Sequence, residues 1–358
     1  KGAGDMSAEQ IADFFANAGG SIAGSCGNNS IYWQASVLSG GFDEALSILA
    51  DVVQHPTFPA KELEILRPRQ LADIDRVDED WQPQLMAKFR AEFFKGSPLA
   101  LLTEGGKDVV AKATVGQISK HHSKYVRGGD SVLAIFGRFD ADAAAKRVKE
   151  LFADLPGGTV DVKTPPAPKV PADGKRVVMK TEKNIAAVIV AVPGMTVDNP
   201  DRFPLNVLDT IISGYRLPSG WLHAELRGKQ LVYVVHAYNF PALAPGAFIT
   251  YAAGEPDKAP EILRIIDANL RKASNYTPTE VEIKRAVNTI LTADVLGNQS
   301  MSSLAMTAAT DELFGFGYDF RNKIEAIYAR ITPADVAAVG KKYLSGGYFT
   351  VVTTPEPK

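Results

Sequence analysis

Arg227 and Tyr233 are the side chains of this sequence best suited to act on another molecule. Apolar residues recur at helical spacing over 221–227, and Gly228 is placed to end that helix. Residues 231–235 then alternate as in a strand, with Tyr233 on one face. A guanidinium and a phenol both donate hydrogen bonds, so together they suit a peptide carbonyl or a developing oxyanion. The competing interpretation is structural: Arg227 bonds the last helical carbonyls and Tyr233 lies in the core.

The composition indicates two ordinary domains with hydrophobic cores. The chain has 358 residues, 46% of them hydrophobic, and its 39 basic and 41 acidic side chains give a net charge of −2. Charges this well mixed provide no basic surface for nucleic acid, and no apolar run approaches the roughly 18 residues of a membrane span. Cys26 is the one cysteine, which excludes an internal disulfide and a cysteine metal cluster. We expect Cys26 to be a small buried residue.

Periodicity and capping signals predict the helices and strands that surround the turn between Arg227 and Tyr233, which we call the Arg227 turn. Helices are expected over 8–17, 42–54, from Pro59 onward, over 84–94, 115–125, 140–152, 204–212, 257–270, 278–296 and 333–343. Strands are expected over 30–37, 131–137, 177–180, 186–192, 247–253 and 348–353. Pro68 should interrupt the helix that begins at Pro59. Prolines and glycines crowd 156–176, which we interpret as an exposed linker between domains.

The chain contains an internal repeat. Thr114 matches Thr332 and Tyr125 matches Tyr343, each pair 218 residues apart, and three further landmarks share that offset. Two homologous domains follow, over 1–155 and 177–358, with the Arg227 turn in the second. Each is expected to be an α+β domain with a mainly antiparallel sheet and helices on one face. At this offset the first copy lacks about its first 40 residues.

The five histidines do not form a recognisable metal site. His121 and His122 are adjacent, so on a helix they point about 100° apart and cannot share a metal. We expect both to lie on the solvated surface. His223 and His236 flank the Arg227 turn on separate elements, where a core or rim position is expected.

Several segments, taken in order, resemble a known family. They are SAEQIADFF, IYWQASVL, FDEALSILADVV, SVLAIFGRFD, DRFPLNVLDTIISG, ELRGKQLVYVV and ITPADVAAVGKKYL. Their sequence and order are similar to the pitrilysin/insulinase/mitochondrial-processing-peptidase family of zinc metallopeptidases. The resemblance implies an H-x-x-E-H motif on a helix, whose histidines bind zinc and whose glutamate is the general base. That motif would fall upstream of Lys1.

The resemblance also implies a third zinc ligand on the helix that begins at Pro59, and there this chain departs from the family. The ligand position holds Asp73 in place of glutamate, and the supporting glutamate is replaced by Leu66. Pro68 lies between them, and Ala23 stands where active halves carry asparagine. We therefore interpret Asp73, Leu66 and Ala23 as degenerate metal-site positions and expect no metal and no zinc cofactor in this chain, the zinc belonging to the partner half.

Members of the family work as two halves that close around a peptide. The resemblance implies that the zinc-free half presents an arginine and a tyrosine from L-R-x-K-x-x-L-x-Y to the substrate. Here the segment from Leu226 to Tyr233 is one residue shorter. The expected partners are a catalytic half or subunit bearing H-x-x-E-H and a peptide substrate.

Three interpretations remain open. The chain is a zinc-free half or subunit of such a peptidase, a catalytic half whose zinc segment lies upstream of residue 1, or a structural subunit of the same fold. The substitutions at 73, 66 and 23 disfavour the second, and the retained Arg227 and Tyr233 disfavour the third. If the source is bacterial, the resemblance favours the periplasm over the cytoplasm.

Overall fold

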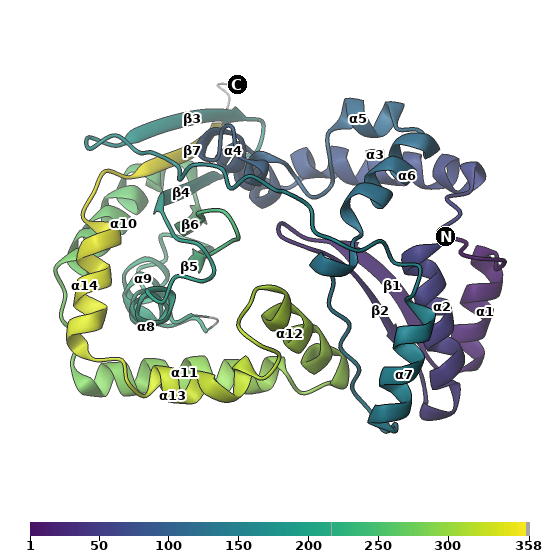
Figure 1. Ribbon diagram of the computed structural model, residues 1–358. Helices are drawn as coiled ribbons and strands as arrows, with labels where there is room; N and C mark the ends of the chain where they lie inside the picture. Colours follow the sequence, from purple (N-terminus) through teal and green to yellow (C-terminus); the bar gives the residue numbers. More distant parts are fainter. Residues whose placement is uncertain (216, 356–358) are drawn as a thin grey trace. The chain divides into compact units, whose positions relative to one another are not determined.

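The computed structural model describes residues 1–215 and 217–355, which form two compact units (Figure 1). Unit 1 comprises Lys1–Asp75, Thr103–Lys163 and Asn298–Arg321. Unit 2 comprises Arg76–Leu102, Thr164–Gly297 and the chain from Asn322 to the last described residue. Each unit is therefore built from three separate segments of the sequence. The boundaries of the units differ from those of the repeats predicted over 1–155 and 177–358.

Unit 2 is built on a five-stranded mixed sheet in the order β3-β7-β4-β6-β5. The strands are β3 (Lys175–Thr181), β4 (Ala186–Pro193), β5 (Val234–Phe240), β6 (Ala247–Gly254) and β7 (Phe349–Pro355). The β3–β7 pair is parallel and the other three pairs are antiparallel, which confirms a mainly antiparallel sheet. β4 is central and buried on both faces, as its run of small and branched residues predicts.

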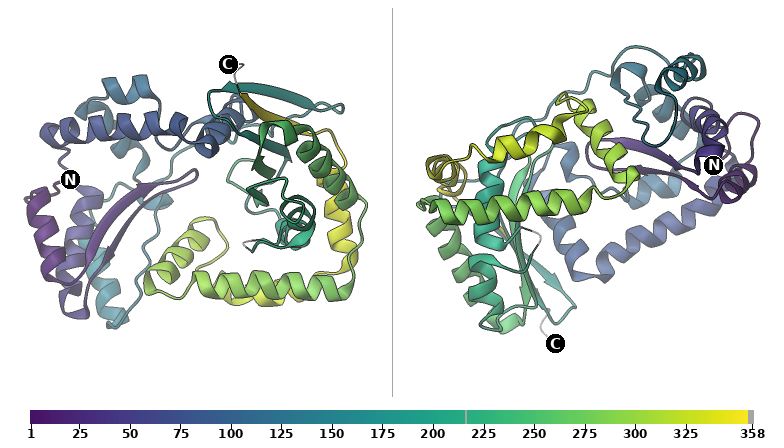
Figure 2. Two further views of the ribbon diagram at one scale, coloured as in Figure 1. Left: turned by 180° about the vertical axis from the view of Figure 1, so that it is seen from behind. Right: turned by 90° about the horizontal axis from the view of Figure 1, so that it is seen from below.

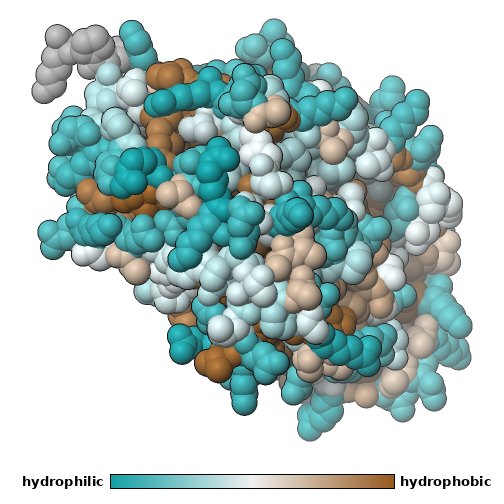
Figure 3. Space-filling view, turned by 90° about the vertical axis from the view of Figure 1, so that its left-hand side faces the viewer, coloured by the Kyte–Doolittle hydropathy of each residue, from teal (hydrophilic) through white to brown (hydrophobic). Residues whose placement is uncertain are grey.

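Helices cover one face of this sheet. They are α8 (Arg202–Ser213), α10 (Ala259–Ser274) and α14 (Pro333–Leu344), with α11 (Glu280–Gly297) packed on α8. Val188, Val190 and Val192 of β4 enter the same core as the apolar stripe of α10, because alternate strand residues share a face. Figure 3 shows the outer side of α10 and α14, which is mainly hydrophilic with a few hydrophobic patches between charged side chains.

The opposite face of the sheet is covered by α4 (Trp81–Phe93), which corrects the expectation of helices on one face only. Leu85, Phe89 and Phe93 recur every four residues on α4 and pack on the sheet. The Phe93 and Phe349 rings meet edge to face with centroids 5.3 Å apart. A helix from the first half of the sequence thus completes the core of the second unit, and the α+β fold class is confirmed.

Unit 1 pairs two strands, β1 (Ser21–Cys26) and β2 (Ile31–Ser36), in an antiparallel hairpin. Ile11, Phe15 and Ile48 lie at the centre of its small core. The helices are α1 (Ala8–Asn17), α2 (Phe42–Gln54), α3 (Ala60–Glu79), α5 (Lys107–Lys112), α6 (Val115–Tyr125), α7 (Ala141–Leu151) and α12 (Met301–Leu313), seen from two further sides in Figure 2. The last turn of α3 is assigned to unit 2.

Helix capping agrees with the repeat. Thr114 caps α6 and Thr332 caps α14, and each forms a reciprocal capping box with the residue three positions later. At the offset of 218, α2 corresponds to α10 and α3 to α11. The corresponding elements are therefore of the same kind in both copies.

The segment 131–137 departs from the repeat, because it joins no strand ladder although a buried strand was expected there. Its counterpart β7 pairs with β3 and β4, and no first-copy equivalents of those two strands are found within residues 1–215 and 217–355. Leu133 is 39% exposed, whereas the corresponding Val351 is fully buried. A strand needs a partner for its backbone groups, so the apolar sequence alone does not make one.

Helix α3 continues through Pro68, so the expected interruption does not occur. Pro68 removes one hydrogen bond from the helix, but the side chain of the neighbouring Arg67 makes several hydrogen bonds. Its guanidinium donates to the carbonyls of Val110 at 2.6 Å and Ala113 at 2.8 Å and to Glu64 at 2.8 Å. These bonds anchor the helix beside the proline.

Candidate functional site

The Arg227 turn is a short helical passage that ends in a tight bend. α9 (Gly220–Leu222) continues into a π-helical turn, His223–Arg227, whose Leu226 is fully buried. A Cβ on Gly228 would lie 2.4 Å from the Ala224 carbonyl oxygen, so only glycine fits this close approach. Gln230 follows with φ 57°, in the left-handed region. π-helical turns are uncommon and are frequent at functional sites.

The structure brings Arg227 and Tyr233 together. Nη1 of Arg227 donates a hydrogen bond to the main-chain carbonyl of Tyr233, and the Tyr233 amide donates to the Ala253 carbonyl at 2.7 Å. The Tyr233 side chain is 57% exposed, so it is not a core residue. The strand begins at Val234 rather than at residue 231, which leaves Tyr233 just outside the ladder. Arg227 thereby fixes the backbone from which the phenol projects.

The two histidines that flank the turn are in contact. The His223 and His236 rings lie with centroids 5.1 Å apart, and His223 is buried. Burial, followed by His236 and Arg227, lowers the pKa of His223, and burial lowers the pKa of His236. Both imidazoles are therefore kept neutral at neutral pH. His223 is a core residue, as expected for this pair, while His236 is half-buried at the rim.

The degenerate metal-site positions do not fit a zinc ion. Asp73 and Leu66 lie two turns apart on α3, and Ala23 lies in β1; all three are exposed. Leucine and alanine side chains have no atom that can coordinate zinc. Within residues 1–215 and 217–355, no group of three histidine, cysteine, aspartate or glutamate side chains is placed to hold a metal.

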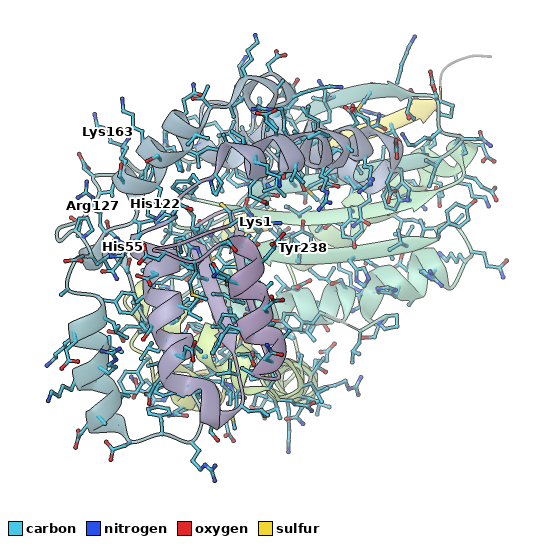
Figure 4. The ribbon with its side chains drawn as sticks, turned by 90° about the vertical axis from the view of Figure 1, so that its right-hand side faces the viewer. Lys1, His55, His122, Arg127, Lys163 and Tyr238 are labelled. Carbon is cyan, nitrogen blue, oxygen red and sulfur yellow. The ribbon has the colours of Figure 1, made fainter. Side chains whose placement is uncertain are left out.

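The remaining candidates differ partly from expectation. Cys26 is exposed at the end of β1, so the expected burial is wrong. His121 is exposed, but His122 is half-buried beside Phe58, with centroids 5.6 Å apart. Figure 4 labels His122 and His55 in unit 1; His55 lies 3.6 Å from Asp154. None of these side chains lies in the same unit as Arg227.

Unit 2 also contains a buried polar pair that the sequence patterns did not predict. Asp209 of α8 is almost fully buried, and its Oδ1 lies 2.7 Å from Ser213 Oγ. The available signal was a single aspartate within the apolar run of α8. Burial raises the pKa of Asp209 to about 8.

Comparison with known proteins decides the family. Residues 1–106 match the family described as "Insulinase (Peptidase family M16)", and residues 112–290 match "Peptidase M16 inactive domain". The chain belongs to peptidase family M16. The resemblance inferred from its sequence segments is therefore confirmed, including the inactive-domain character of the part that holds Arg227 and Tyr233.

Several relatives of this M16 chain are bacterial proteins. It is 26% identical to an uncharacterized zinc protease of Streptomyces coelicolor, covering 96% of this chain and 76% of that protein. It is 25% identical to an uncharacterized zinc protease of Rickettsia bellii, covering 99% and 85%. A solved structure described as a peptidase M16 inactive domain from Pseudomonas fluorescens has the same fold, with a TM-score of 0.89, 19% identity and coverage of 99% and 85%.

Membrane-spanning helices were sought among the described residues of this M16 chain. None of its described helices is both long enough and apolar enough to cross a bilayer.

Proposed function

We propose that this chain is the zinc-free half or subunit of an M16 peptidase and contacts the peptide substrate through Arg227 and Tyr233. The observation that carries the proposal is the bond from the Arg227 guanidinium to the Tyr233 carbonyl, beside an exposed phenol. The match of 112–290 to the inactive domain supports it. So do Leu66 and Ala23, which offer no ligand atoms at the degenerate positions.

The two side chains have complementary parts in this proposal. Arg227 uses one N–H on the Tyr233 carbonyl and keeps further donors in its planar fork. The Tyr233 hydroxyl is a second donor, on a ring that is 57% exposed. Both can donate to substrate carbonyl oxygens as negative charge develops near the scissile bond. The partner half, with H-x-x-E-H, supplies the zinc and the hydrolytic water.

The test is peptide cleavage by the native assembly of this chain with the segment or subunit that carries H-x-x-E-H. Tyr233→Phe isolates the hydroxyl, and Arg227→Lys keeps the charge but loses the fork. Each should lower kcat and kcat/KM together, by about 10²–10³ for a well-placed donor. A quenched fluorescent peptide of about ten residues is the probe.

Two results would contradict the proposal. If both variants keep kcat/KM within about twofold of wild type, below roughly 0.4 kcal/mol, the pair is structural. If this chain, purified alone, holds stoichiometric zinc with Asp73 as a ligand, it is a catalytic half. Thermal unfolding of both variants serves as the control for folding.

A further inference from the structure

A row of four rings runs from the Arg227 turn across β5 and β6. His223 contacts His236 at 5.1 Å between centroids, His236 contacts Tyr251 at 5.9 Å, and Tyr251 contacts Tyr238 at 6.3 Å. His236 and Tyr251 are also direct cross-strand partners in the sheet. Tyr238, labelled in Figure 4, ends the row. The row is therefore one continuous surface attached to the turn.

This row lies where the cover of α4 stops. On the α4 side of the sheet, Ile249 and Ala253 of β6 are buried, with 2% and 0% exposure. His236 and Tyr238 of β5, together with Tyr251, are only half-buried. We call His236, Tyr238 and Tyr251 the aromatic shelf. It is a sheet face that the protein's own helices leave partly open.

The aromatic shelf carries no charge at neutral pH. Burial lowers the pKa of His236 and raises the pKa of Tyr238 to about 12. Burial also raises the pKa of Tyr251, whose hydroxyl interacts with the Gln82 side chain at the start of α4. Rings that stay neutral suit an aromatic or aliphatic side chain better than an ionised one, because an ion would lose its hydration here.

We propose that the aromatic shelf is a substrate subsite that binds an aromatic side chain of the peptide. The proposal rests on the function proposed for Arg227 and Tyr233. The ring contacts from His223 to Tyr238 span at most about 17 Å, the length of about five extended peptide residues. A peptide whose carbonyl meets Arg227, beside His223 in the turn, therefore places a side chain three to five residues away on the shelf.

The peptide meets the shelf through side chains rather than as an added strand. The Ala237 carbonyl of β5 already accepts a hydrogen bond from Ser213 Oγ at 3.0 Å. Strand addition at this edge would have to share that carbonyl with Ser213. Contacts between a peptide side chain and the rings of the shelf leave the bond between Ser213 and Ala237 unchanged. Recognition therefore depends on the type of side chain that the peptide carries at this position.

The experiment compares peptides that carry one phenylalanine, moved stepwise along an alanine-rich sequence, in the native assembly. We expect kcat/KM to rise about three- to tenfold when phenylalanine stands three to five residues from the scissile bond, and not elsewhere. Tyr251→Leu and Tyr238→Leu should remove the difference between the phenylalanine and alanine peptides. Tyr318→Leu, which alters a tyrosine of unit 1 that is 73% exposed, is the matched control and should retain it.

A second measurement does not depend on these variants folding. A peptide with benzoylphenylalanine at the preferred position should photo-crosslink to β5, to Tyr251 or to the nearby Met86, located by mass spectrometry. The subsite is wrong if no position is preferred, if both leucine variants keep the preference, or if crosslinks fall elsewhere. Arg227→Lys and Tyr233→Phe lower cleavage of phenylalanine and alanine peptides alike, so failure of the proposed function is distinguishable from failure of the subsite.

Discussion

Asp209 Oδ1 lies 2.7 Å from Ser213 Oγ, one helical turn away on α8, and both side chains are almost fully buried. Ser213 Oγ also lies 3.0 Å from the Ala237 carbonyl, to which its single proton can be donated. A protonated Asp209 can donate to Ser213, and Ser213 can then donate to Ala237 without a conflict. The raised pKa of Asp209, about 8, is consistent with that chain of donors.

Asp209 should make the free energy of unfolding depend on pH. Its pKa rises from 3.8 to about 8 on folding, so the native state binds the extra proton between those values. The contribution of Asp209 to stability is therefore fully present below about pH 3.8 and is lost as the pH rises toward 8, by at most about 1.4 kcal/mol per pH unit. Urea unfolding of wild type and Asp209→Asn at pH 5 to 8 measures this. The variant should lose that slope, whereas Asp267→Asn, on the exposed side of α10, should keep it.

His223 should have the opposite effect in the acid range. Burial and the neighbouring His236 and Arg227 lower its pKa from 6.5, so the unfolded chain takes up the proton first. Stability present above about pH 6.5 is then lost as the pH falls. Replacing His223 by phenylalanine keeps an aromatic ring and removes the titration, which should reduce acid destabilisation. His121→Phe, at an exposed position, is the comparison; an equal change in both variants would rule out this explanation.

Phe89 should be a major contributor to unit 2 although it comes from the first half of the sequence. Its side chain is fully buried between α4 and the sheet, with its ring 6.2 Å from that of Phe349. Phe89→Ala should cost about 3–5 kcal/mol, from lost burial and the cavity left behind. Phe136→Ala, at a site 45% exposed, should change stability by no more than about 0.5 kcal/mol. Chemical denaturation compares the two, and similar losses would contradict the assignment of α4 to this core.

The segments 131–137 and Phe349–Pro355 should differ sharply in amide hydrogen exchange. They are equivalent in the repeat, but only the second is paired on both sides. Unpaired amides exchange through small local openings, whereas central strand amides need larger ones. Exchange followed by mass spectrometry should show 131–137 labelled within seconds and 349–355 protected for hours or longer. Equal protection would mean that 131–137 has strand partners.

Local patterns predicted the elements better than their assembly. The capping residues Thr114 and Thr332 marked two helix starts correctly, because the capping signal lies within four residues. The stripe Leu85–Phe89–Phe93 shows that α4 is amphipathic, but periodicity does not say which sheet the stripe meets. The same limit explains segment 131–137, whose apolar sequence fits a strand without identifying the partners it needs.

The candidate site was predictable to a similar degree, because residue type and spacing, together with the family resemblance, single out Arg227 and Tyr233. The structure places the two in contact through the backbone of Tyr233, and their contact with substrate stays a prediction. The π-helical turn and the late start of β5 depend on the fit of Gly228 against Ala224, which no residue pattern encodes. Asp209 was not predicted, because its hydrogen bond with Ser213 becomes significant only when the burial of both side chains is known.

Each unit combines segments that are distant in the sequence, so a fragment of the gene encodes an incomplete unit. The chain passes from one unit to the other after residues 75, 102, 163, 297 and 321. Cutting the gene at the proline-rich linker, 156–176, separates the chain at only one of these five connections. A product from residue 177 onward would be made without α4, leaving Phe349 and its neighbours to face water and other nascent chains. Neither predicted repeat coincides with a compact unit, so we expect that neither folds when it is expressed by itself.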